Sequence, residues 1–117
     1  MKAIIIAAGN AKRLGSKTKK TPKGLLNING QSIIERQINI FRKNKIKEIF
    51  IIRGPHREKF NFKEVKYIED LEYEKHDVLL SLMAAKKEFN EDLITTYSDI
   101  LFDEKILQQV IKSKVNI

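Results

Sequence analysis

The sequence lacks cysteine and tryptophan altogether, and it has only two prolines in 117 residues. Because there is no cysteine, disulfide bonds and thiolate metal sites are excluded. No apolar run approaches the roughly 20 residues of a membrane-spanning helix, and the apolar segment at the N-terminus is too short for a signal peptide. For a chain of this length we therefore expect a single globular domain located in the cytoplasm.

Acidic residues are missing from the first part of the chain, where none precedes Glu35. From Glu35 onward 16 lysines and arginines face 15 acidic residues, so the net charge of +8 is concentrated near the N-terminus. Six basic residues of that part share one loop: Lys12, Arg13, Lys17, Lys19, Lys20 and Lys23. Such a patch fits a bound phosphate or a nucleic acid. The loop has no aromatic residue on which a base could stack, which argues against nucleic acid.

The basic loop follows an apolar run, residues 4–7, that is typical of a strand buried on both faces. Gly9 comes next and allows a sharp turn, because it has no Cβ. A buried strand that leads into a glycine and a basic loop is how α/β proteins hold phosphates with backbone N–H groups and cations. The alternative is an ordinary strand exit followed by solvated lysines.

Strand and helix patterns alternate along the chain and predict an α/β fold. We expect a Rossmann-like three-layer α/β/α arrangement with a mostly parallel sheet. The predicted strands are residues 2–7, a short extended piece at 25–28, 48–52, 65–68 near an edge, and 93–97. The predicted helices are residues 32–44, 77–89 and one that Asp103 opens.

Each predicted helix has a start signal and an apolar stripe. Ser32 and Glu35 form a capping box, and Asp77 and Asp103 are candidate N-caps. The apolar stripe of the second helix is expected to contain Val78, Leu79, Leu82, Met83 and Phe89. The stripe of the third is expected to contain Ile106, Leu107, Val110 and Ile111.

Two polar features fall at the carboxyl ends of predicted strands, where open α/β sheets bind ligands. One is the glycine loop and the other is Asp99, which follows the strand at 93–97. Mg²⁺ often takes only one or two carboxylates together with phosphates and water, so Asp99 is a candidate ligand. The alternative is that Asp99 caps the following turn.

The run Ala7-Ala8-Gly9-Asn10-Ala11-Lys12-Arg13-Leu14, followed by Thr21-Pro22-Lys23, resembles the signature of the nucleotidyltransferases. These enzymes join a nucleoside triphosphate to a phosphorylated small molecule and release pyrophosphate. The segment Ser98-Asp99-Ile100 resembles their metal-binding aspartate segment. Family members are about twice as long, so residues 1–117 are expected to form a nucleotide-binding domain equivalent to the N-terminal half of the family fold, apparently truncated.

The resemblance implies a nucleotide-binding site made of Ala7, Ala8, Gly9, Asn10, Ala11, Lys12, Arg13, Lys23 and Ser81. Arg13 and Lys23 would be the catalytic cations, which hold the phosphates and neutralise charge at the α-phosphorus. Asp99 would bind Mg²⁺. Ala11 departs from the family, because it stands where a second glycine is usual and its methyl group would crowd the phosphates.

The segment 73–82 resembles the phosphocholine and 2-aminoethylphosphonate cytidylyltransferases, which implies CTP as the nucleotide. Asp70, Glu72 and Glu74 would then favour a cationic acceptor, or they would only balance nearby lysines. His56 and His76 are expected at the surface. A non-catalytic nucleotide-binding module and a basic nucleic-acid-binding protein are the alternative functions. Exposed sheet edges and apolar faces also predict a homodimer.

Overall fold

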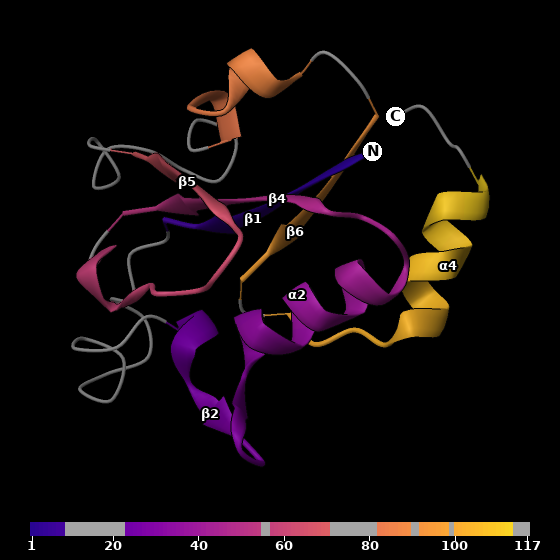
Figure 1. The fold of residues 1–117 in the computed structure, drawn as a ribbon, viewed down its shortest axis with the longest axis horizontal. Coiled ribbons are helices and arrows are strands. Elements are labelled where there is room, and N and C mark those ends of the chain that lie inside the picture. Colours follow the sequence, from indigo (N-terminus) through magenta and orange to yellow (C-terminus); the bar gives the residue numbers. More distant parts are fainter. Residues whose placement is uncertain (9–22, 55–56, 71–81, 90–91, 99, 114–117) are drawn as a thin grey trace.

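Strand β1 (Lys2–Ala7) is an inner strand of a parallel sheet (Figure 1). All six of its residues are buried. It pairs with β4 (Glu48–Arg53) on one side and with β6 (Leu93–Tyr97) on the other. Strand β5 (Lys66–Glu69) pairs with β4, which gives the order β5-β4-β1-β6. The computed structural model describes residues 1–8, 23–54, 57–70, 82–89, 92–98 and 100–113.

The predicted α/β fold and the parallel sheet are confirmed. Strands β1 and β6 have the predicted bounds, β4 is one residue longer than predicted, and β5 begins and ends one residue later than predicted. Strand β5 lies at one edge of the sheet, as expected. Long apolar runs mark β1 and β4, because both faces of each strand meet a core.

One face of the sheet is covered by helices α2 (Ile33–Lys43) and α4 (Glu104–Ser113). Its core holds the odd-numbered side chains of β1 and β4 together with residues of both helices: Ala3, Ile5, Ala7, Ile34, Ile38, Phe41, Ile49, Ile51 and Leu107. Ser32 caps α2 as predicted, because its Oγ accepts a hydrogen bond of 3.1 Å from the Glu35 N–H.

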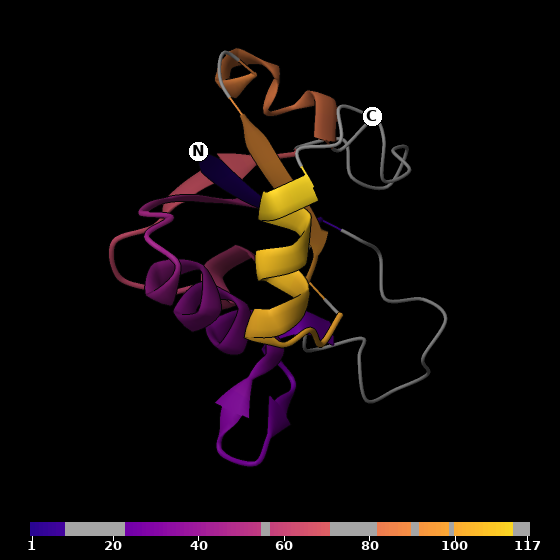
Figure 2. The ribbon, with the colours of Figure 1, turned by 90° about the vertical axis from the view of Figure 1, so that its right-hand side faces the viewer.

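The opposite face of the sheet carries the even-numbered side chains of β1 and β4, which pack against Leu82 and Ala85. The views in Figure 1 and Figure 2 place the segment 82–89 on the side away from α2. The sheet therefore separates two layers, as the three-layer prediction requires. The N-terminal part of the predicted helix at 77–89 lies outside the described residues.

In the described part of that predicted helix only residues 82–83 are α-helical. A turn follows at residues 84–85, and η4 (Lys86–Glu88) is a 3₁₀ helix, so the α-helix does not continue to residue 89 as predicted. The Ala85 N–H donates to Leu82 O and the Glu88 N–H donates to Ala85 O, so the hydrogen bonds of this segment join residues three apart. With three residues per turn, Leu82, Ala85 and Glu88 share one face. Met83 and Phe89 are therefore exposed, at 45% and 41%, and their prediction as part of a buried stripe is wrong.

A two-residue turn joins the short strands β2 (Asn27–Ile28) and β3 (Gln31–Ser32) just before α2. Asn29 and Gly30 both have positive φ, 51° and 89°, as the Asn-Gly pair of a hairpin turn requires. Leu25 is not extended, which corrects the predicted piece at 25–28. It closes the 3₁₀ turn η2 (Lys23–Leu25), and that turn directs its side chain against the core of the α2 face.

Helix α4 begins as predicted, because Asp103 Oδ1 accepts a hydrogen bond of 2.9 Å from the Ile106 N–H. Leu107 is buried, but Ile106 and Val110 are 50% and 51% exposed, so their predicted inward orientation is wrong. The reason is the contact with α2, which the sequence pattern of α4 alone does not reveal.

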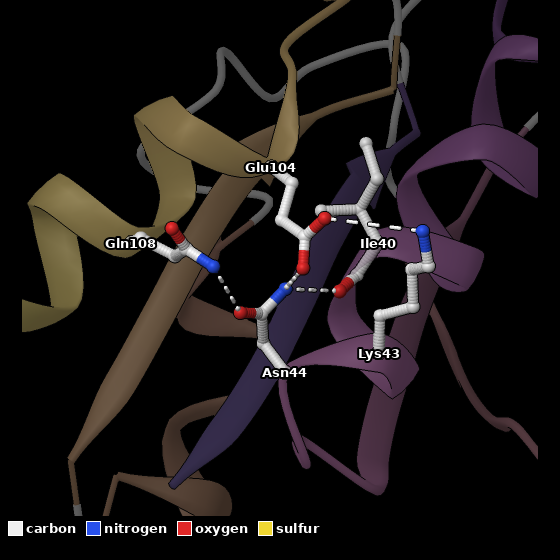
Figure 3. A network of polar contacts seen from close by, with 5 residues as sticks. All are labelled: Ile40, Lys43, Asn44, Glu104 and Gln108. Carbon is white, nitrogen blue, oxygen red and sulfur yellow. Dashed lines mark hydrogen bonds and ion pairs between the residues drawn. The ribbon is translucent and has the colours of Figure 1, made fainter.

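Polar side chains fix the rotation of α4 against the C-terminal end of α2 (Figure 3). Asn44 donates to Ile40 O at 2.9 Å and to Glu104 Oε1 at 3.3 Å, and it accepts from Gln108 Nε2 at 3.4 Å. Lys43 Nζ lies 3.9 Å from Glu104 Oε2. These contacts direct the side of α4 that carries Glu104 and Gln108 toward α2 and leave Ile106 and Val110 facing away.

In the described part of the chain, no helix is both long enough and apolar enough to cross a membrane. The homodimer and the cytoplasmic location stay predictions, as does the surface position of His56 and His76, which lie outside the described residues.

Candidate functional site

The carboxyl ends of the four parallel strands meet at one edge of the sheet, where β1 ends at Ala7 and β6 ends at Tyr97. Ala7 and Ala8 are 4% and 1% exposed and pack into the two cores on opposite faces of the sheet. Of the predicted site residues, Gly9, Asn10, Ala11, Lys12, Arg13, Ser81 and Asp99 lie outside the described residues. The structure therefore describes the residues that surround and support these positions, which we call the frame of the site.

The turn after β6 is anchored to the end of β1. The Ser98 N–H donates to Ile6 O at 3.0 Å, and the Ile100 N–H donates to Tyr97 O at 3.3 Å. Gln37 of α2 donates from Nε2 to Tyr97 O at 2.8 Å and to Ile100 O at 2.7 Å. The backbone on both sides of residue 99 is thereby held by a central strand and a core helix.

Gly24 brings a third segment to the same place. It is buried in η2, and a Cβ placed on it would lie 2.7 Å from Ile34 Cδ1 and 2.8 Å from Ser98 Cβ. Real Cβ contacts are not that short, so only glycine lets η2 pack against the turn after β6. Lys23 belongs to this 3₁₀ turn, and its backbone therefore lies close to the turn that carries Asp99.

A charged pair lies on the other side of β1 at the same edge. Arg53 at the end of β4 forms an ion pair with Glu69 of β5, and the guanidinium carbon lies 4.0 Å from the centroid of the Tyr67 ring. The Asp70 N–H donates to Arg53 O at 2.8 Å, and Asp70 is 4% exposed. Asp70 is thus a buried residue of the frame, whereas Glu72 and Glu74 lie outside the described residues.

The described residues do not include three His, Cys, Asp or Glu side chains grouped closely enough to hold a metal ion by themselves. Mg²⁺ needs no such group, because it is commonly bound by one or two carboxylates together with substrate phosphates and water. A single aspartate on a turn whose backbone is fixed on both sides supplies a donor of that kind. The carboxylate of Asp99 is of the kind that Mg²⁺ takes, and its role as a ligand stays a prediction.

Residues 3–115 match the family of MobA-like NTP transferase domains. The chain belongs to this family. Its resemblance to the nucleotidyltransferases is thereby confirmed, and the match extends over β1, the anchored turn after β6 and the 3₁₀ turn that follows the basic loop. The MobA-like fold accounts for the parallel sheet whose carboxyl edge gathers these segments.

Two curated relatives of this MobA-like domain are cytidylyltransferases. The choline-phosphate cytidylyltransferase of Streptococcus pneumoniae is 32% identical over 117 residues, which cover 97% of the chain and 51% of the relative. The 2-aminoethylphosphonate cytidylyltransferase of Lancefieldella rimae is 33% identical, with 91% and 46% covered. The chain thus spans about half the length of the curated relatives it matches.

A solved structure supports the same relationship. The CTP:phosphocholine cytidylyltransferase from Streptococcus pneumoniae superposes with a TM-score of 0.81 at 32% identity, over 88% of the chain and 47% of that protein. The inositol-1-phosphate CTP transferase from T. maritima superposes with a TM-score of 0.75 at 21% identity, over 92% of the chain and 46% of that protein, and shows the same fold.

Two residues that support the site, Gly24 and Gln37, were not predicted from the sequence. Gly24 follows the Pro22-Lys23 pair, and no local sequence pattern predicts that the side chains of Ile34 and Ser98 pack against it. Gln37 could have been found, because it is a polar residue inside the apolar stripe formed by Ile34, Ile38 and Phe41. A polar residue at such a position commonly has a buried partner.

Proposed function

We propose that the chain carries the nucleotide-binding site of a cytidylyltransferase. The reaction transfers CMP from CTP to a small phosphorylated acceptor such as phosphocholine, 2-aminoethylphosphonate or a sugar phosphate, and it releases pyrophosphate. The observation that supports this most is the meeting of three segments at the end of β1, where Ser98 bonds Ile6 and packs against Gly24. Each segment adjoins one of the residues that the family resemblance assigns to the phosphates or the metal.

In the proposed site the backbone from Ala7 to Ala11, together with Lys12, binds the nucleotide, and Ser81 lies near the base. Arg13 and Lys23 bind the phosphates as cations, which is the electrostatic contribution that such a reaction needs most. Asp99 would hold Mg²⁺, which when bound neutralises phosphate charge.

The proposed chemistry is an in-line displacement at the α-phosphorus of CTP. An oxygen of the acceptor phosphate forms the new bond to the α-phosphorus, and the bond to the bridging oxygen of the β-phosphate breaks. Pyrophosphate leaves with that electron pair. Because the attacking oxygen is already anionic, no general base is required, and the acceleration comes from positioning and charge stabilisation.

Residues 1–117 are proposed to be the nucleotide-binding part of this enzyme, and the curated relatives that bear the names of the two acceptors are about twice as long. The alignment of an acceptor phosphate with the α-phosphorus contributes on the order of 7–11 kcal/mol to such reactions. We therefore expect the 117-residue chain to bind CTP and to release pyrophosphate slowly or not at all when phosphocholine is added.

The test compares the melting temperature of the chain with Mg²⁺ and each of CTP, UTP, ATP and GTP. A ligand that binds only the folded state stabilises it by about 2.7 kcal/mol at a concentration 100 times its Kd. We expect the largest rise with CTP. Equal rises with all four triphosphates would remove the cytidine assignment, and no rise with any of them would remove the nucleotide site.

Alanine variants of four basic residues distinguish a specific phosphate site from a diffuse basic surface. Arg13→Ala and Lys23→Ala are expected to abolish most of the rise with CTP, whereas Lys17→Ala and Lys19→Ala leave it nearly unchanged. A nucleic-acid surface would instead lose affinity by a similar step with each lost charge, and its binding would fall steeply with salt. A graded loss across the four variants would therefore contradict the proposal.

A further inference from the structure

Gln37 is the only polar residue among the five buried residues of α2. It is 1% exposed and lies between Ile34 and Ile38 on the face that meets the core. An apolar residue of similar length would fill this position without bringing an amide group out of water. The glutamine therefore has a use other than filling the core.

The amide of Gln37 is used for its two donors. Its Nε2 donates to both Tyr97 O and Ile100 O. Of the two ends of the amide only the NH₂ group can donate hydrogen bonds, so these two contacts determine which way the amide is oriented. Its Oε1 has no hydrogen-bond partner within the part of the chain that the structure describes. The two acceptors lie on either side of residues 98–99, so one side chain ties both ends of that turn.

The same turn is held on its other sides by β1 and η2. The Ser98 N–H bonds Ile6 O at 3.0 Å, and Ser98 Cβ fills the space beside Gly24. These contacts fix the first half of the turn. The hydrogen bond from Gln37 to Ile100 O is the side-chain contact that fixes the second half.

We propose that Gln37 is a positioning residue, which holds the turn between β6 and α4 so that Asp99 meets a metal ion bound with the nucleotide. The inference rests on the proposed function, since it takes Asp99 as the metal ligand. Residues that orient a metal ligand commonly change metal affinity by about 10–100-fold when they are replaced. Gln37 acts through the backbone and touches neither nucleotide nor metal, so we expect an effect at the lower end, about tenfold.

The experiment measures binding of Mn²⁺ to the 117-residue chain by the loss of its electron paramagnetic resonance signal, with and without CTP. CTP affinity without metal is measured separately by calorimetry. Gln37→Met keeps the length and the apolar fit of the side chain but has no donor. Gln37→Glu keeps the shape but places an acceptor against both carbonyl oxygens.

Two control variants separate positioning from stability. Ile38→Val lowers stability from the neighbouring position of the same helix without touching the turn, and Gln108→Met makes the same chemical change at an exposed site. Both should bind Mn²⁺ with CTP within about twofold of the wild type. Gln37→Met should weaken the metal-dependent binding about tenfold and leave the metal-free CTP affinity within twofold, and Gln37→Glu should weaken it further.

Unchanged metal-dependent binding in both Gln37 variants would overturn the inference. An equal loss of metal-free and metal-dependent CTP binding would also overturn it, because a general structural defect has that result. Failure of the proposed function would give a different result. The wild type would then bind no Mn²⁺ with CTP, or Asp99→Asn would bind Mn²⁺ as well as the wild type does. Either result would reject the inference together with the metal assignment.

Discussion

Replacing Gly24 with alanine is expected to destabilise the chain by about 1–3 kcal/mol, the usual cost of adding a methyl group to a packed core. The new Cβ would lie 2.7 Å from both Cγ1 and Cδ1 of Ile34 and 2.8 Å from Ser98 Cβ. Ile34 is fully buried and cannot swing into solvent. Gly24 is not among the glycines with positive φ, so the cost comes from packing and not from backbone strain.

Double variants identify the source of this cost. Ile34→Ala removes the two atoms nearest to the new methyl group, although alone it should cost about 2–5 kcal/mol through the cavity it leaves. In the Gly24→Ala background the methyl group occupies part of that cavity, so the two changes together should cost less than their sum by about 0.5–3 kcal/mol. Ser98→Gly should relieve the second contact in the same way.

The assay is urea unfolding, with the midpoint compared at a constant slope so that the denatured state is shown to be unchanged. Gly30→Ala is the matched control, because Gly30 has φ of 89° and a methyl group at its Cα would have nothing within 4 Å. Its cost should come from the backbone and add to that of Ile34→Ala without coupling. A neutral Gly24→Ala, or additive costs for Gly24→Ala and Ile34→Ala, would refute the packing argument.

Two further predictions concern local structure. Ser32→Ala and Asp103→Ala should each lower the free energy of unfolding by about 1 kcal/mol, because each removes an N-cap hydrogen bond, and replacement by asparagine should restore most of it; an unchanged urea midpoint would contradict this. Met83→Gln should change stability by no more than about 0.5 kcal/mol, whereas Leu82→Ala should cost more, because Leu82 packs on the sheet. The reverse order would show that the 3₁₀ face is wrongly assigned.

The four strands of the parallel sheet and helix α2 could be predicted because their signals are local. Continuous apolar runs mark β1 and β4, and the Ser32 cap fixes the start of α2 to the residue. The face that α4 turns inward could not be predicted. Leu107 and Ile106 are equally apolar, and Leu107 turns inward where α4 meets the core and where Glu104 contacts Asn44, a residue 60 positions away.

The apolar stripe predicted for the segment 82–89 was wrong for a similar reason. Leu82, Met83 and Phe89 fit an α-helical stripe, but Glu88 bonds Lys2 at 3.0 Å, and this contact accompanies a tighter turn with a different face. In the candidate site, the roles of the motif residues were inferred from family resemblance and stay predictions. The residues that surround and support them were recognised only in the structure. Gly24 and Gln37 contribute through partners that lie far along the chain, Ser98 and Tyr97.

The central place of β1 in the sheet also determines the order in which the chain can fold. Lys2 pairs with Glu48 on one side and with Leu93 on the other, so one edge of β1 stays open until β6 has been made. At about 5–20 residues per second, the ribosome completes β6 several seconds after β1. Sheets that depend on such distant pairings fold slowly, and their unpaired strands are prone to aggregate meanwhile. Of its two partners β1 therefore waits longer for β6, and until then its edge of unpaired backbone N–H and C=O groups is where a chaperone would be needed.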